Sequence, residues 1–78
     1  MYVLMENYDN GLSYDDHEHF ETQIAVSKNI ELLMEYAENR IAPYTLEWGE
    51  VKDDENIVFK SNKVDEYMYT IERTTFLQ

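Results

Sequence analysis

Residues 20–41, FETQIAVSKNIELLMEYAENRI, decide the fold because a strand pattern passes directly into a helix pattern within them. From Phe20 to Val26, every second residue is apolar or threonine, and the residues between them are polar or small. This two-residue period is typical of a strand with one buried and one solvated face. From Ile30 onward the apolar residues recur every three or four positions, which predicts a helix with one apolar face.

The predicted helix covers residues 30–41. Ser27 or Asn29 is suited to cap its first turn, because their side-chain oxygens accept hydrogen bonds from otherwise unpaired backbone amides. Pro43 ends the helix, since proline has no amide hydrogen and disfavours helical geometry in the residue before it. The residues of the apolar face are Ile30, Leu33, Met34, Ala37 and Ile41.

A further strand is expected before this stretch, at residues 2–8. Its residues alternate between two faces, with Val3 and Met5 on one and Tyr2 and Leu4 on the other. The Asp-Asn-Gly sequence that follows favours a tight turn, because asparagine and glycine tolerate positive φ values. Residues 2–8 and the strand from Phe20 are therefore predicted to form a hairpin.

Three more strands are expected after the helix, at residues 44–52, 57–60 and 66–77, separated by polar and turn-rich stretches. The full order β-β-α-β-β-β predicts an α+β fold, in which an antiparallel sheet of four to five strands carries one helix on one face. Because 78 residues hold one hydrophobic core, we expect residues 1–78 to form a single domain.

The charge of the chain is strongly negative. Seventeen acidic residues against six basic ones give a net charge of −11, more than the magnitude of about 2 to 8 that keeps a small domain soluble. Such a charge repels nucleic acid and anionic membranes, and it accelerates encounters with basic surfaces. We therefore expect a basic protein as the partner, with no direct binding of nucleic acid and no membrane association.

The absence of cysteine excludes disulfides, thiolate catalysis and cysteine-based metal sites. The first residues do not join a basic segment to an apolar run, and no window approaches the roughly 18 apolar residues that span a bilayer. These features predict a cytoplasmic location.

Residues 13–21, SYDDHEHFE, combine four carboxylates with two histidines. On a strand, His17 and His19 would lie on the same side, where they could share a metal ion with Asp15 or Glu21. This pattern is less specific than the helical His-Glu-x-x-His signature, and a solvated turn explains it more simply. We expect no metal and no cofactor.

Paired carboxylates elsewhere raise the question of acid-base catalysis. Asp15 and Asp16, or Asp53 and Asp54, would need unequal environments so that one acid is protonated while the other is ionised. Adjacent acids in polar runs are instead both solvated, and no nucleophile-base pair, phosphate loop or cofactor fingerprint accompanies them. The sequence therefore predicts a protein that is not an enzyme.

The acidic residues themselves are the main candidate for a binding site. Alternate strand residues lie about 6 to 7 Å apart and helix neighbours about 5 to 6 Å apart, whereas each strand of a duplex places a phosphate every 3.4 Å or so. Carboxylates on a folded scaffold thus approach the charge density of nucleic acid, which would let them occupy a basic groove in its place. The alternative interpretation is that these acids form an ordinary solvated face with no partner. The candidate partner-binding residues are Asp15, Asp16, Glu18, Glu21, Glu31, Glu35 and Glu38.

The short length, the acidity, the lack of cysteine and the α+β plan resemble the small anti-CRISPR and antirestriction proteins of phages and mobile elements. Some of those proteins mimic nucleic acid and cover the arginines with which a nuclease reads its target. The resemblance implies a non-enzymatic inhibitor that binds a nuclease of a defence system, in the cytoplasm of the host cell. Its binding would weaken with added salt.

An alternative hypothesis is a protein-interaction module or homodimer without mimicry. The open sheet face, an edge strand or the tyrosine-rich last strand would then make the contact, with Tyr67 or Tyr69 as contact residues, and binding would survive high salt. Trp48 could also serve as an exposed anchor, but the single tryptophan of a small domain is more often part of its core. We predict a core position for Trp48.

Overall fold

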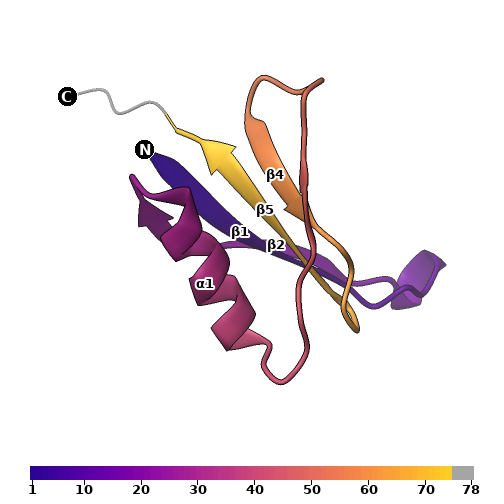
Figure 1. Ribbon diagram of the computed structural model, residues 1–78. Coiled ribbons are helices and arrows are strands. Elements are labelled where there is room, and N and C mark those ends of the chain that lie inside the picture. Colours follow the sequence, from indigo (N-terminus) through magenta and orange to yellow (C-terminus); the bar gives the residue numbers. More distant parts are fainter. Residues whose placement is uncertain (75–78) are drawn as a thin grey trace.

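A computed structural model describes residues 1–74 and shows one five-stranded antiparallel sheet with one α-helix on one face (Figure 1). The strand order is β2-β1-β5-β4-β3. The predicted α+β fold, with its order β-β-α-β-β-β, is confirmed. The elements are β1 (Tyr2–Asp9), a short 3-10 helix η1 (Tyr14–Asp16), β2 (His19–Ser27), α1 (Ile30–Arg40), β3 (Trp48–Glu50), β4 (Ile57–Ser61) and β5 (Tyr67–Arg73).

The helix α1 begins after the predicted cap residue Asn29 and ends shortly before Pro43. Asn29 is its cap, because the Asn29 side chain accepts a hydrogen bond of 2.9 Å from the amide of Glu31. The last helical residue is Arg40, and Ile41 closes the helix with its amide donating to the carbonyl of Ala37. The helix lies over the half of the sheet formed by β2, β1 and β5 (Figure 1).

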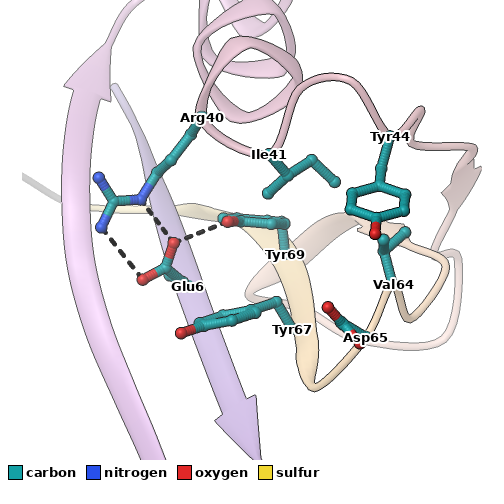
Figure 2. A pocket seen from close by; sticks show the side chains of 8 residues that line it. All are labelled: Glu6, Arg40, Ile41, Tyr44, Val64, Asp65, Tyr67 and Tyr69. Carbon is teal, nitrogen blue, oxygen red and sulfur yellow. Dashed lines mark hydrogen bonds and ion pairs between the residues drawn. The ribbon is translucent and has the colours of Figure 1, made fainter.

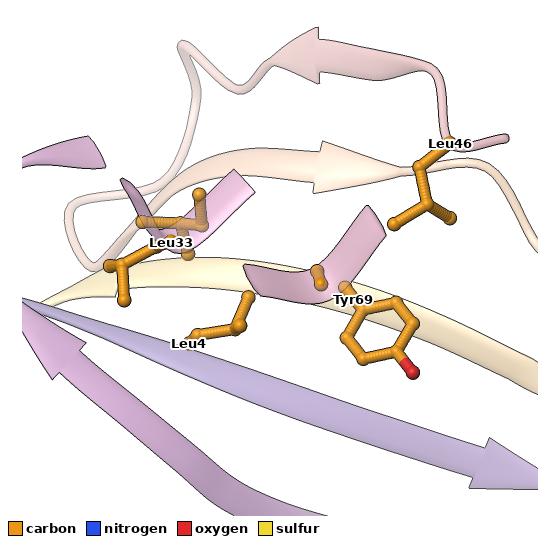
Figure 3. Close-up of a cluster of buried hydrophobic side chains, with 6 residues drawn as sticks. Leu4, Leu33, Leu46 and Tyr69 are labelled. Carbon is orange, nitrogen blue, oxygen red and sulfur yellow. The ribbon is translucent and has the colours of Figure 1, made fainter. Parts of the chain in front are cut away.

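The core lies between α1 and the central strands. Leu4 of β1 is paired with Ile71 of β5, and both side chains are fully buried beneath the helix residue Leu33. The buried cluster is completed by Ala37, Leu46 and Tyr69 (Figure 3). Leu46 comes from the segment that connects α1 to β3, so this segment extends the core toward β4 and β3. The predicted core position of Trp48 is met only in part, because Trp48 is partly buried and packs against the buried cluster without belonging to it.

The predicted alternation in β2 is interrupted by a β-bulge. Leu4 pairs with Ala25 and Met5 pairs with Gln23, which leaves Ile24 as an extra residue on β2. The bulge shifts the phase by one residue, so that Val26 moves to the face opposite to Phe20 and is 50% exposed. The expectation of one uninterrupted apolar face from Phe20 to Val26 was therefore wrong.

The first and last strands after the helix are shorter than predicted, whereas β4 at Ile57–Ser61 is one residue longer than the predicted range 57–60. Of the predicted strand 44–52, only Trp48–Glu50 forms a strand, because the residues before Trp48 cross over the core as a connection. The last strand begins at Tyr67 and ends at Arg73, and residues 75–77 of the prediction lie outside the described residues. Within residues 1–74, no helix is long and apolar enough to cross a membrane.

Candidate functional site

Acidic side chains gather at one end of the sheet, where the β1–β2 loop meets the turn before β5. The amide of Asp9 donates a hydrogen bond of 2.9 Å to the carbonyl of Glu66, which holds the two segments side by side (Figure 1). We call this surface the acidic end. Its residues are Asp9, Asp15, Asp16, Glu18 and Glu66.

The β1–β2 loop is organised by one side chain, Asn10. The carbonyl oxygen of its side chain accepts hydrogen bonds of 3.1 Å from the amides of Leu12 and Glu18, and its amide nitrogen donates one of 2.7 Å to the carbonyl of Asp16. Gly11 adopts a φ of +73°, which glycine adopts without strain. These bonds fix the backbone that carries Asp15, Asp16 and Glu18, so the three exposed carboxylates stand on an ordered loop.

Asp9 helps to hold the loop rather than facing a partner. Its Oδ1 accepts a hydrogen bond of 2.8 Å from the amide of Gly11 and lies 3.2 Å from Nε2 of His17. These two contacts lower the pKa of Asp9, with the Gly11 amide as the larger cause. By contrast, no ion pair joins Asp15 or Asp16 to a basic group in the part of the chain that the structure describes.

The two histidines converge on Asp9. The rings of His17 and His19 are stacked with centroids 6.3 Å apart, and Nδ1 of His19 lies 3.8 Å from Oδ2 of Asp9. Nε2 of His19 is also 3.7 Å from Oε1 of Glu21. Among residues 1–74, no group of three or more histidines, cysteines and acids has a geometry that would hold a metal ion. Both imidazole rings thus lie against the Asp9 carboxylate at the base of the acidic end.

A row of aromatic rings crosses the three strands next to the acidic end. Phe20 of β2 and Tyr67 of β5 both pair with Tyr8 of β1, so the three side chains share one face. The ring centroids are 6.1 Å apart for Tyr8 and Phe20, and 5.3 Å apart for Tyr8 and Tyr67. Phe20 is 58% exposed. The nearby Glu66 carboxylate raises the pKa of Tyr8 above its ordinary value of 10.0.

A polar network lies next to this row, under the end of α1. The Glu6 carboxylate accepts hydrogen bonds from Nε and Nη2 of Arg40 and, at 2.7 Å, from the hydroxyl of Tyr69 (Figure 2). The side chain of Glu6 is 14% exposed, whereas that of Arg40 is 45% exposed. The network therefore ties the last turn of α1 to the central strands.

The sequence contains a signal for this network. Tyr2, Leu4, Glu6 and Tyr8 occupy alternate positions of one strand, so they point to the same face. Because Leu4 belongs to the core, a carboxylate two residues later requires a partner from the covering helix. Arg40, in the last turn of α1, supplies it.

Acid is expected to weaken the fold through Glu6. The hydrogen bond from Arg40, assisted by that from Tyr69, outweighs the effect of burial and holds the pKa of Glu6 below its ordinary value of 4.5. The Glu6 carboxylate therefore binds a proton more tightly in the unfolded chain than in the folded protein. The stability that ionised Glu6 contributes is complete above about pH 4.5, and it is lost as the pH falls through the lower pKa of Glu6 in the folded state.

Urea unfolding of the natural protein and of Glu6→Gln between about pH 6 and pH 3 measures this effect. Protonation of the other acids also relieves their mutual repulsion, but it does so in both proteins. The difference between the two curves therefore isolates Glu6, and it should shrink as the pH decreases. A constant difference would contradict the assignment.

The seven predicted partner-binding residues fall into two groups. Asp15, Asp16 and Glu18 lie at the acidic end, and Glu21 lies next to it on β2. The other three are exposed on α1, which begins at the opposite end of the sheet and stands apart from the β1–β2 loop (Figure 1). These three are Glu31, Glu35 and Glu38.

Sequence reasoning missed Asp9 and Glu66, which the pairing of β1 with β5 brings together, and Asn10, which holds the β1–β2 loop. It also placed Tyr69 among the residues that contact a partner, and this was wrong. Tyr69 is 1% exposed, because its pairing with Glu6 turns it toward the core. Tyr67 is 38% exposed and remains accessible.

Comparisons of this chain with protein-family models, with curated protein sequences and with solved structures find no match. The candidate site therefore rests on the geometry and chemistry described above.

Proposed function

We propose that the protein is a non-enzymatic inhibitor, which binds the basic nucleic-acid-binding surface of another protein through its acidic end. The observation that supports this most is the ordered loop, in which Asn10 fixes the backbone beneath Asp15, Asp16 and Glu18. Carboxylates on a fixed loop lose little conformational entropy on binding, unlike those of a flexible acidic tail. A nuclease of a defence system has the required surface, since its nucleic-acid channel is lined with basic side chains.

The charge of the whole chain supports the same partner. A net charge of −11 attracts basic surfaces over long distances and accelerates association with them. Two exposed apolar side chains lie beside the acidic end, Leu12 at 56% and Phe20 at 58% exposure. Apolar contacts beside complementary charges are typical of binding surfaces, because the apolar part supplies affinity and the charges supply specificity.

The double substitution Asp15→Lys, Asp16→Lys is expected to weaken partner binding by about ten- to a hundred-fold, because attraction becomes repulsion at two exposed positions. The immobilised protein is exposed to a host-cell extract at low salt, and bound proteins are released with duplex DNA or with high salt. The expected ligands are basic nucleic-acid-binding proteins that both treatments release. Their binding is then measured with the purified proteins.

The control Asp53→Lys, Glu55→Lys makes the same change of charge in the β3–β4 loop, at the other end of the sheet. This control should bind almost normally. Asn10→Ala, which leaves the charge unchanged, should also weaken binding, because it releases the loop. Equal effects of the two double substitutions, or binding that resists both salt and DNA, would contradict the proposal.

A second candidate function is favoured by the edge strand β2. This strand has nine residues and one unpaired edge, and it exposes Phe20 and Val26, whereas the other edge strand, β3, has three residues. Long edges of this kind can receive a strand from a partner or from a second copy. Association through β2 would survive high salt and would be lost in Val26→Lys. A measurement of molecular mass at several protein concentrations detects self-association through this edge.

A further inference from the structure

A cavity of about 320 Å³ opens between the end of α1, the segment after it and the turn before β5 (Figure 2). Its volume is at the lower end of the range of about 300 to 1,000 Å³ that is usual for ligand sites. The space therefore suits one long side chain better than a large molecule. The cavity adjoins the acidic end, because Tyr67 both lines it and belongs to the aromatic row.

Three tyrosines are among the eight residues that line the cavity. Tyr69 is buried, but Tyr44 is 58% exposed and Tyr67 is 38% exposed. Figure 2 shows the rings of Tyr44 and Tyr67 on two sides of the space, with Ile41 above it. Partly exposed aromatic rings attract cations, because the ring faces carry a negative partial charge.

The charges around the cavity also favour a cation. Glu6 is already neutralised by Arg40, and Figure 2 shows the Arg40 guanidinium turned away from Tyr44 and Asp65. Asp65 is exposed at the rim and forms no ion pair or side-chain hydrogen bond with another residue of the described part of the chain. The C-terminal end of α1, next to Ile41, adds a partial negative charge.

The geometry points to a binding site for an arginine side chain of the partner, with its guanidinium between Tyr44 and Tyr67 and directed at the Asp65 carboxylate. This inference rests on the proposed function, which requires a basic partner. A guanidinium is planar, stacks on aromatic rings and donates two parallel hydrogen bonds to a carboxylate, whereas an ammonium group does not. The acidic end would supply long-range attraction, and this cavity would recognise one particular side chain.

An NMR titration of the isotope-labelled protein with blocked Gly-Arg-Gly tests the site. We expect saturable shifts of the backbone amides of Ile41, Tyr44 and Asp65. Blocked Gly-Lys-Gly should bind more weakly, and the uncharged citrulline analogue should cause no comparable shifts. Tyr44→Ala and Asp65→Asn should each weaken the binding of the arginine peptide by about three- to ten-fold.

Matched controls come from the same chain. Tyr36→Ala removes a tyrosine that is 47% exposed on α1 outside the cavity, and Asp53→Asn removes an acid from another loop. Asparagine is used at position 65 because the φ of Asp65 is +56°, which asparagine tolerates. Both controls should bind the arginine peptide like the natural protein.

Equal shifts with the arginine and citrulline peptides, or equal affinities of Tyr44→Ala and Tyr36→Ala, would overturn the arginine site. These results would leave the proposed function intact, provided that Asp15→Lys, Asp16→Lys still weakens binding of the basic partner. The opposite outcome has two parts. If Tyr44→Ala loses arginine binding, the arginine site is retained. If Asp15→Lys, Asp16→Lys leaves partner binding unchanged, the proposed function is rejected.

Discussion

Leu33→Ala is expected to lower the free energy of unfolding by about 2 to 5 kcal/mol. Leu33 is 2% exposed and forms part of the buried cluster with Leu4 and Ile71. Shortening its side chain removes apolar contacts and leaves a cavity, because the paired central strands cannot move in to fill it. Domains are typically stable by about 5 to 15 kcal/mol, so this single change removes a large part of the total.

Leu32→Ala is the matched control, since it makes the same chemical change at the preceding position of α1. Leu32 is 55% exposed, and its replacement should change the stability by no more than about 0.5 kcal/mol. Denaturant unfolding followed by the fluorescence of Trp48, which packs against the core, measures both variants. Similar losses in the two variants would show that the helix does not bury the face containing Leu33.

The second large effect is expected for Glu6→Ala, at about 2 to 4 kcal/mol. The change removes the acceptor for Arg40 and for the hydroxyl of Tyr69, which is then left unpaired in a largely buried position. Most of the cost comes from this hydroxyl, because the half-exposed Arg40 side chain can return to water. We therefore expect Arg40→Ala to cost less than Glu6→Ala.

Glu38→Ala provides the comparison, because Glu38 is exposed on α1 and should affect stability by no more than about 0.5 kcal/mol. Tyr69→Phe removes the hydroxyl but keeps the ring, with an expected cost of about 1 kcal/mol. Combining it with Glu6→Ala should cost less than the sum of the two changes, since they break the same hydrogen bond. Additive effects would show that Glu6 and Tyr69 stabilise the fold independently.

The elements that sequence patterns predicted well are those that local interactions determine. The cap at Asn29, the apolar spacing of α1 and the turn containing Gly11 all depend on residues within a few positions of one another. The bulge at Ile24 and the shortness of β3 depend instead on pairing with distant strands. Periodicity within one strand carries no information on such pairing, and these two features were missed.

The same distinction applies to the candidate site. The cluster of acidic residues near Asp15 was visible in the sequence. The position of Glu66 beside Asp9 depends on the pairing of β1 with β5, which the sequence pattern did not show. That pairing also decides that Tyr69 faces the core. A pattern of alternating residues gives two possible faces, and only the neighbouring strand selects between them.

The central position of β1 and β5 has a consequence for the biosynthesis of the protein. The strand nearest the start of the chain pairs with the strand nearest its end, so the contacts at the centre of the sheet have high contact order. A nascent chain can form the β1–β2 hairpin and α1 early, but it lacks Tyr69 and Ile71 until β5 has been synthesised. The protein therefore acquires its core only after β5 has emerged from the ribosome.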